Sequence, residues 1–232
     1  MIFAGIVAGG CGSRMKCADI PKQFLEIGGE PIVVRTVKRF LEIDSIDKVY
    51  IGIKPDWHDY MCELADKFSL DMNRLSIIDG GIDRNGTVMN IIDRIKIDFG
   101  CNKGDIILTH DAVRPFVSEK IILDNIECAK KHSACGTYVP AVDTIVKSCG
   151  KIVETTLDRS VLYQAQTPQS FEITELLKCF ESLSHEQKFG LTDTCSIFTA
   201  CGKDIHIVSG DVMNFKITTD NDLFIARALT DK

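Results

Sequence analysis

The chain has 232 residues, of which 45% are hydrophobic and 26% charged, and its formal net charge is -6. A chain of this length can bury a proper core, and this composition is that of a soluble globular protein rather than a disordered one. The negative charge excludes a basic face that would attract nucleic acid or anionic lipid, so any phosphate must be bound by cations placed locally. We therefore expect a globular protein that binds neither nucleic acid nor membranes.

Targeting and metal-binding signals are also missing from the sequence. No apolar run approaches the roughly 18 to 20 residues of a membrane span, and the N-terminus lacks the basic flank and cleavage site of a signal peptide. The ten cysteines form no C-x-x-C pair, and the five histidines stand at no ligand spacing from a cysteine pair. We therefore expect a cytoplasmic protein with reduced cysteines and no zinc site.

Short runs rich in β-branched residues alternate with longer amphipathic runs along the chain. This alternation is typical of strand–helix units wound onto a mostly parallel sheet. The predicted strands are residues 3–7, 48–53, 75–79, 105–110, 136–141 and 204–209. The predicted helices, from apolar residues at three- and four-residue spacing, are 31–42, 59–68, 86–99, 118–132, 174–183 and 220–229. Thr219 and Asp222 have the spacing of a capping box for the last helix.

One interval, residues 142–160, breaks the alternation, because strand-like residues there flank a turn at Ser148–Lys151 that contains Gly150. This pattern indicates a β-hairpin inserted in the α/β body. A hairpin has too little core to be stable alone, so it must pack on its own domain or on a second subunit. We therefore expect one domain over residues 1–232 with an inserted β-arm at about 142–160.

A glycine-rich run follows the first predicted strand, with Gly9, Gly10 and Gly12 just before Arg14. Glycine lets backbone amides approach an anion closely, so a glycine turn after a strand favours a phosphate site. The run is not a dinucleotide fingerprint, because Met15 stands where the third glycine is required. It also lacks the Gly-Lys-Ser/Thr that a P-loop needs.

A second cation, Lys22, follows Arg14 after Pro21. Phosphoryl and nucleotidyl transfer depend mainly on electrostatic stabilisation of a triphosphate, which arginine and lysine supply. The alternative is that Arg14 and Lys22 are solvated loop residues, as many loop cations are. The residues alone leave both interpretations open.

The run AGGCGSRM (8–15), followed by PKQFLEIGGEPIV (21–33), resembles the signature of the nucleotidyltransferases that activate sugar and polyol phosphates, G-x-G-x-R-M and then P-K. Six further segments follow in the order found in the cytidylyltransferases that act on methylerythritol 4-phosphate and on ribitol 5-phosphate. They are DGGIDRNGTV (79–88), HDAVRPF (110–116), VDTIVKS (142–148), TLDRSVLYQAQTPQSF (156–171), LTDTCSI (191–197) and NFKITTDND (214–222). The resemblance implies a Rossmann-like, GT-A-like α/β nucleotidyltransferase fold, whose protruding β-arm joins two subunits into a homodimer.

The resemblance also implies a set of residues that bind CTP. The implied contacts to CTP are Val7, Ala8, Gly9 and Gly10 in the first turn, and Gly80, Gly81, Ile82, Asp83, Arg84, Asn85, Gly86 and Thr87 around cytosine and ribose. Arg14 and Lys22 match the pair that neutralises the triphosphate as pyrophosphate leaves. Asp111 matches an aspartate that shares Mg²⁺ with phosphate oxygens, although the residues alone favour a turn residue at a strand end. Gly86 departs from the family pattern, where a side chain is more common.

On the acceptor side, the resemblance implies that Arg159 and Lys216 grip and orient the phosphate of a polyol phosphate. The other implied substrate-binding residues are Arg114, Thr144, Thr167 and Thr192. Because Arg159 follows the arm, the resemblance implies that it acts at the neighbouring subunit's site. Taken alone, the sequence around Arg159 favours an exposed arginine in a turn over a site residue.

The implied reaction is attack of the acceptor phosphate on the α-phosphorus of CTP, a task of positioning and charge. The segments at 163–171 and 191–197 resemble the ribitol 5-phosphate branch more closely. We therefore expect D-ribitol 5-phosphate as acceptor and CDP-ribitol, a precursor of teichoic acid or capsule, as product. The alternative acceptor is methylerythritol 4-phosphate of isoprenoid synthesis. A reductase that makes the acceptor is a further candidate partner.

Two other functional classes fit the sequence less well. A nicotinamide-dependent oxidoreductase needs an acidic residue after the second strand, where Lys54 and Pro55 stand. A non-catalytic nucleotide sensor has no reason to combine Arg14, Lys22 and Lys216. The sequence therefore favours a transferase.

Overall fold

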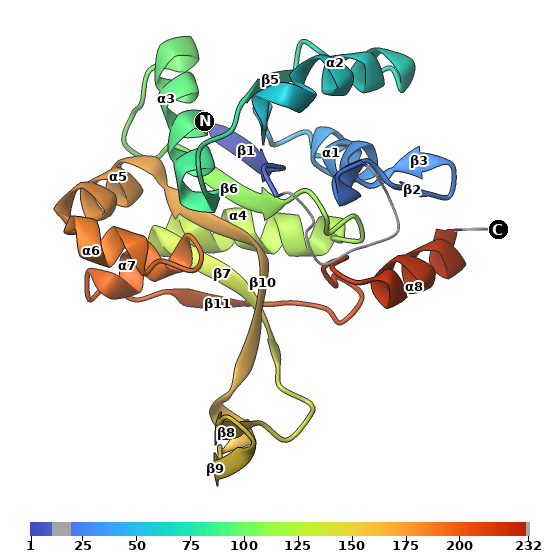
Figure 1. The fold of residues 1–232 in the computed structure, drawn as a ribbon. Coiled ribbons are helices and arrows are strands. Elements are labelled where there is room, and N and C mark those ends of the chain that lie inside the picture. Colours follow the sequence, from blue (N-terminus) through green and yellow to red (C-terminus); the bar gives the residue numbers. More distant parts are fainter. Residues whose placement is uncertain (11–19, 231–232) are drawn as a thin grey trace.

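The computed structural model describes residues 1–10 and 20–230. A seven-stranded sheet with the order β11-β7-β10-β6-β1-β4-β5 forms its centre (Figure 1). Its strands are β1 (Ile2–Val7), β4 (Lys48–Ile53), β5 (Leu75–Asp79), β6 (Ile106–Asp111), β7 (Ala134–Pro140), β10 (Tyr163–Glu172) and β11 (His206–Ser209). Neighbouring strands are parallel, except that β10 runs antiparallel to both β6 and β7. The predicted α/β fold with a mostly parallel sheet is confirmed.

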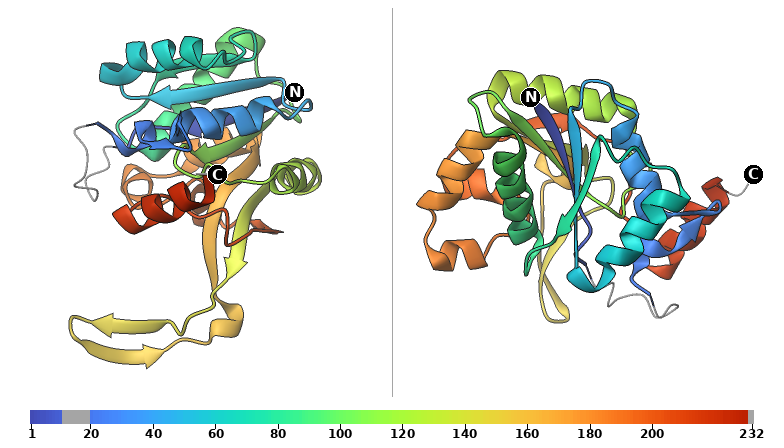
Figure 2. Two further views of the ribbon diagram at one scale, coloured as in Figure 1. Left: turned by 90° about the vertical axis from the view of Figure 1, so that its right-hand side faces the viewer. Right: turned by 90° about the horizontal axis from the view of Figure 1, so that it is seen from above.

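Helices cover both faces of the sheet (Figure 2). The helices of the described residues are α1 (Ile32–Leu41), α2 (His58–Lys67), α3 (Arg84–Phe99), α4 (Glu119–His132), α5 (Ile173–Ser182), α6 (His185–Phe189), α7 (Cys195–Ala200) and α8 (Asp220–Thr230), of which α8 packs on the small unit formed by β2 (Glu26–Ile27) and β3 (Glu30–Pro31). Successive strand residues point to opposite faces, so Ala4 and Ile6 of β1 join the core cluster under α1 and α4, whereas Phe3 joins the cluster under α3 and α5. The result is a three-layer α/β/α body.

Strand β10 is absent from the predicted strands although it lies in the middle of the sheet. Its sequence, YQAQTPQSFE, contains three glutamines and a proline, which are typical of a loop. In the fold these polar side chains find partners inside the protein, as when the Gln169 side-chain carbonyl accepts from the Thr194 amide at 3.2 Å. The short helices α6 and α7 were likewise not predicted, and α3 begins two residues earlier than predicted.

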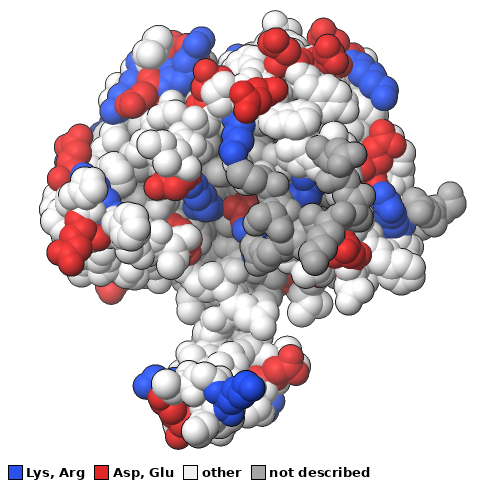
Figure 3. All heavy atoms as spheres, viewed as in Figure 1, with Lys and Arg blue, Asp and Glu red and all other residues white. Residues whose placement is uncertain are grey.

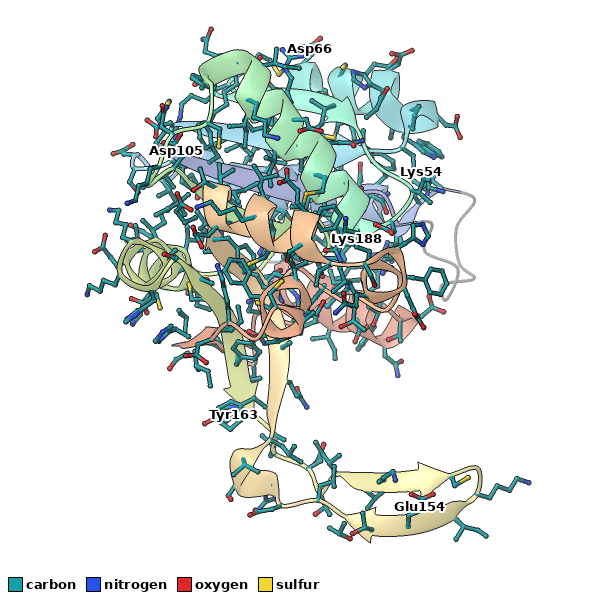
Figure 4. All side chains as sticks on the ribbon, turned by 90° about the vertical axis from the view of Figure 1, so that its left-hand side faces the viewer. Lys54, Asp66, Asp105, Glu154, Tyr163 and Lys188 are labelled. Carbon is teal, nitrogen blue, oxygen red and sulfur yellow. The ribbon has the colours of Figure 1, made fainter. Side chains whose placement is uncertain are left out.

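The chain leaves the body between β7 and β10 to form an arm (Figures 1 and 2). Strands β8 (Val146–Cys149) and β9 (Ile152–Thr156) pair only with each other, and Gly150 in the turn has a φ of 64°. Every residue of both strands is exposed. Figure 4 marks the base of the arm at Tyr163 and its far part at Glu154. The predicted hairpin is therefore present and makes no core of its own.

The remaining short elements lie near the strand ends. They are η1 (Lys22–Phe24), β2 (Glu26–Ile27), β3 (Glu30–Pro31), η2 (Pro55–Trp57) and η3 (Arg159–Val161). The predicted capping box of α8 is confirmed, because the Thr219 amide donates to Asp222 Oδ2 at 2.7 Å and the Asp222 amide to Thr219 Oγ1 at 3.2 Å. Within residues 1–10 and 20–230, no helix combines the length and the apolar character that crossing a membrane requires.

Candidate active site

A cavity of about 430 Å³ opens where the carboxyl ends of β1, β4 and β6 meet. In open α/β sheets this edge is where ligands bind. Most of the residues predicted to contact the nucleotide line this cavity. Lys22 and Lys216 of the predicted catalytic set line it as well. These lining residues are Val7, Ala8, Gly9, Gly10, Lys22, Gly81, Ile82, Asp83, Arg84, Thr87, Asp111 and Lys216. Arg14 lies outside the described residues.

Hydrogen bonds with two other segments of the chain hold the turn after β1 in place. The Ala8 amide donates to the Gly52 carbonyl at 2.8 Å. The buried side chain of Gln23 donates to the carbonyls of Ala8 at 2.8 Å and Gly10 at 3.3 Å. Gln23 thereby ties the segment that carries Lys22 to the glycine turn. Gln23 was not among the predicted site residues, although it stands beside Lys22 in the quoted motif.

The second predicted loop folds back onto the first turn of α3. The Gly80 amide donates to the Ile53 carbonyl at 2.6 Å, and the Gly81 amide donates to Thr87 Oγ1 at 3.0 Å. A Cβ at Gly81 would lie 2.4 Å from the carbonyl carbon of Gly86, so only glycine fits there. The loop therefore depends on close backbone approach, and the helix N-terminus that follows it borders the cavity, a favourable place for an anion.

Gly86, the departure from the family pattern, has a local explanation. The Asp83 carboxylate caps α3 by accepting from the Gly86 amide at 2.7 Å. A Cβ on residue 86 would lie 3.3 Å from that same carboxylate oxygen, which is tighter than ordinary van der Waals contact. Glycine at this position therefore relieves crowding around the cap.

Asp111 ends β6 at the cavity wall with cations on both of its oxygens. Arg84 Nε lies 3.0 Å from Oδ1, and Lys216 Nζ lies 2.8 Å from Oδ2. Arg114 Nε is 4.0 Å from Oδ2. Burial alone would raise the pKa of the Asp111 carboxyl, but the charges of Arg84, Lys216 and Arg114 hold that pKa well below its usual range. Asp111 is therefore an ionised oxygen donor at neutral pH.

The neighbouring His110 is fully buried behind this carboxylate. Its Nδ1 lies 3.0 Å from Thr167 Oγ1 and its Nε2 lies 3.0 Å from the Arg114 carbonyl oxygen. Burial lowers the pKa of His110 to about 4, so the ring is neutral at pH 7. These contacts give His110 a structural role.

Two residues predicted to bind the acceptor instead brace the wall of the cavity. Arg114 is buried, and its Nη1 donates to the Asn214 carbonyl at 2.7 Å and its Nη2 to the Ala165 carbonyl at 3.4 Å. Thr167 is also buried, and its Oγ1 accepts from the Asp111 amide at 3.1 Å. Neither residue lines the cavity. Their contacts fix the segments that carry Asp111 and Lys216.

The other predicted acceptor residues lie away from the cavity of the same chain. Thr144, Arg159 and Thr192 are exposed, and none of them lines the cavity. Arg159 Nη1 donates to the Val142 carbonyl at 2.6 Å, within the arm. The structure of one chain therefore does not bring the predicted acceptor residues together.

Two further residues at the site were not predicted. Lys54 follows β4 and lines the cavity; it is labelled in Figure 4. Thr194, two residues after the predicted Thr192, is fully buried, and its Oγ1 accepts from Arg84 Nη1 at 2.6 Å. The position of Lys54 directly after a predicted strand could have indicated it as a site residue, whereas no local pattern marks Thr194.

A glycine turn, a helix N-terminus and a cation-flanked carboxylate at the carboxyl edge of a parallel sheet are typical of the nucleotide-binding class of α/β proteins. Comparison with known proteins agrees with this class. The chain belongs to the family described as IspD: 2-C-methyl-D-erythritol 4-phosphate cytidylyltransferase, whose model matches residues 2–232. The family resemblance predicted from the sequence is confirmed.

Among curated relatives, the chain is 44% identical over 234 residues to the ribitol-5-phosphate cytidylyltransferase of Streptococcus pneumoniae, covering 100% of both chains. Among solved structures, it is similar to the 4-diphosphocytidyl-2C-methyl-D-erythritol synthase of Anaerococcus prevotii, with a TM-score of 0.83, 27% identity and coverage of 100% of this chain and 96% of that chain. It is also similar to the 2-C-methyl-D-erythritol 4-phosphate cytidylyltransferase of Francisella tularensis, with a TM-score of 0.81, 28% identity and 98% coverage of each. These similarities extend over the whole fold, including the arm.

Proposed function

We propose that this chain is a cytidylyltransferase that transfers CMP from CTP to D-ribitol 5-phosphate, giving CDP-ribitol and pyrophosphate. The full-length similarity to the ribitol-5-phosphate cytidylyltransferase of Streptococcus pneumoniae supports the choice of acceptor. The structural observation that supports nucleotidyl transfer is Asp111, which is held between Arg84 and Lys216 and lines the same cavity as the glycine turn.

The chemistry that these residues support is an in-line displacement at phosphorus. An oxygen of the acceptor phosphate forms a bond to the α-phosphorus of CTP, while the bond to the departing pyrophosphate breaks. Both reactants are anions, so cations must lower their repulsion and hold them close. Lys22 and Lys216 line the cavity for this task, and the sequence adds Arg14. The mechanism requires no nucleophilic side chain.

The donor set fits Mg²⁺, which in nucleotide sites is held by one or two carboxylates together with substrate phosphates. Asp111 supplies an ionised carboxylate at the cavity wall, and Asp83 lines the same cavity. We propose Asp111 as the metal ligand. Mg²⁺ bound there would neutralise part of the triphosphate charge and draw electrons from the leaving pyrophosphate.

We further propose that the protein acts as a homodimer joined through the arm. The arm and its base expose large apolar side chains, including Val142 and Val161, each 70% exposed, and Ile152, 74% exposed. On the face seen in Figure 3 the stalk that joins the arm to the body carries no charge. Exposed apolar surface of this kind marks an interaction site. A second copy would bring its own Arg159 to a cavity that holds Lys216 but none of the other predicted acceptor residues.

The decisive experiment measures pyrophosphate release from CTP and Mg²⁺ with ribitol 5-phosphate and methylerythritol 4-phosphate in parallel. We expect kcat/KM to be at least about 10-fold higher for ribitol 5-phosphate, the scale on which a site separates similar substrates. A preference for methylerythritol 4-phosphate would replace the acceptor by the alternative. No release with either acceptor would reject the transferase function. Two further points are predictions from the sequence. One is that CDP-ribitol is used to make teichoic acid or capsule, and the other is that a reductase partner makes the acceptor.

A further inference from the structure

Arg84 connects three parts of the fold. From the first turn of α3, its Nε lies 3.0 Å from Asp111 Oδ1 at the end of β6, and its Nη1 donates to Thr194 Oγ1 at 2.6 Å. Its Nη2 is buried and has no hydrogen-bond partner among the described residues. Two directed contacts by one planar guanidinium fix the orientation of both partners.

Thr194 is suited to anchor this guanidinium. Its side chain is fully buried and does not line the cavity. Its hydroxyl accepts from Arg84 and donates to Asn85 Oδ1 at 3.4 Å, and its amide donates to Gln169 Oε1 on β10 at 3.2 Å. Thr194 therefore holds Arg84 from a position that a ligand in the cavity does not contact.

The consequence concerns the orientation of the Asp111 carboxylate. Arg84 engages Oδ1 and Lys216 engages Oδ2, while the Asp111 amide donates to Thr167 Oγ1 at 3.1 Å. The contact of Arg84 with Oδ1 and that of Lys216 with Oδ2 together hold the carboxylate in one orientation. Loss of a group that orients a metal-binding carboxylate typically lowers metal affinity by about 10- to 100-fold.

We propose that Arg84, anchored by Thr194, is a positioning residue that orients Asp111, and through Asp111 the ammonium group of Lys216, toward a nucleoside triphosphate and its divalent cation. Arg84 then acts through Asp111 rather than by recognising cytosine, the role implied by the family resemblance. The identity of the nucleotide as CTP rests on the proposed function, whereas the contacts of Arg84 do not.

The test compares two variants with a matched control. Thr194→Val removes the anchoring hydroxyl and keeps the shape of the side chain, and Arg84→Lys keeps the charge but not the two directed contacts. The control is Thr199→Val on α7, the helix that follows Thr194, because Thr199 is exposed and its hydroxyl donates, among the described residues, only to the Ser196 carbonyl at 3.3 Å. The measurements are Mn²⁺ affinity in the presence of CTP, by electron paramagnetic resonance, and the Mg²⁺ concentration that gives half-maximal activity.

We expect Thr194→Val and Arg84→Lys each to weaken Mn²⁺ binding about 10-fold, with Thr199→Val unchanged. Activity should recover at high Mg²⁺, so that the metal requirement rises more than kcat falls. The double variant should bind Mn²⁺ about as well as Arg84→Lys alone, because both changes remove one linked contact.

Unchanged Mn²⁺ affinity in the folded variants would overturn the proposal, as would a lowered melting temperature with no change in Mn²⁺ affinity. If Thr194→Val does not fold, Arg84→Lys decides by the same criteria. Failure of the proposed function is distinguishable, because the wild type would then release no pyrophosphate with ribitol 5-phosphate. The difference in Mn²⁺ and CTP binding between wild type and variants would still be measured.

Discussion

The nucleotide side and the acceptor side of the proposed site differ in how they are held. The nucleotide side lies at the ends of buried strands, and hydrogen bonds within one chain fix both of its loops and Asp111. On the acceptor side, Thr144 and Arg159 are exposed residues of an arm that has no core. A pocket at strand ends can be complete in one chain, whereas a lone hairpin cannot hold a site by itself. We therefore expect one chain to suffice for binding CTP but not for transferring CMP.

The largest expected effect is on the nucleotide side. Arg14→Ala should lower kcat by a factor on the order of 10² or more, the scale of losing one donor that stabilises transition-state charge. Pyrophosphate release measures this loss, with Arg39→Ala on α1 as control, since the only ion pair of Arg39 among the described residues is an exposed one with Glu42. A nearly normal rate in folded Arg14→Ala would show that Arg14 is a loop cation without a role in catalysis.

A smaller loss is expected on the acceptor side. Arg159→Ala should lower kcat/KM for the acceptor by roughly 10- to 100-fold, the value of one hydrogen bond to a charged group. CTP affinity, measured by calorimetry, should not change, because Arg159 does not line the cavity of its own chain. Weakened CTP binding would show that the two sides are not independent.

Mixing two impaired variants tests whether Arg159 acts across the dimer. If it does, a mixture of Arg14→Ala and Arg159→Ala chains forms heterodimers with one intact site, and activity should return to about a quarter of the wild-type value. The mixture must be allowed to exchange subunits, which analytical ultracentrifugation verifies. No recovery after exchange would place Arg159 at the site of its own chain.

The smallest expected effect on activity at neutral pH concerns His110, which is buried next to Asp111. Its titration should change the stability of the protein at lower pH. Because the pKa of His110 is lowered to about 4 from 6.5, the unfolded chain binds a proton before the folded chain does. Stability should therefore be full above about pH 6.5 and fall by about 3 kcal/mol as the pH decreases toward 4. Urea unfolding across this range measures the loss.

His110→Gln provides the control for this pH dependence, since glutamine does not titrate. The decrease between pH 6.5 and 4 should become much shallower in that variant, even if its stability at pH 7 is lower. Asp111 does not contribute in this window, because a lowered carboxyl pKa removes stability only at more acidic pH. An equally steep decrease in His110→Gln would assign the titration to another group.

The parts of the structure that the sequence could predict are those with a local pattern. Apolar runs located six of the seven sheet strands, and the glycine turn located the edge of the sheet where the cavity lies. Strand β10 escaped because its polar side chains are satisfied by distant partners, as in the bond from Ser170 Oγ to Asn125 Oδ1 at 3.2 Å. Composition alone cannot separate such a strand from a loop.

The interactions around Asp111 could not be predicted for a different reason. Arg84 is 27 residues from Asp111 and 110 residues from Thr194 in the chain. No periodicity joins positions so far apart, and the family resemblance supplied Arg84 and Asp111 without their mutual contact. Arg114 and Thr167 were placed on the acceptor side by resemblance, whereas the fold shows them bonded inside the wall.

Strand β10 gives the arm a mechanical connection to the reaction centre. It is one continuous strand of ten residues, exposed at Tyr163 where the arm joins and buried from Gln166 onward. The Thr167 side chain of this strand accepts a hydrogen bond from the backbone amide of Asp111, and the Gln169 side chain accepts one from the backbone amide of Thr194. The arm is therefore connected to Asp111 and Thr194 through one strand and the two hydrogen bonds that the Thr167 and Gln169 side chains accept.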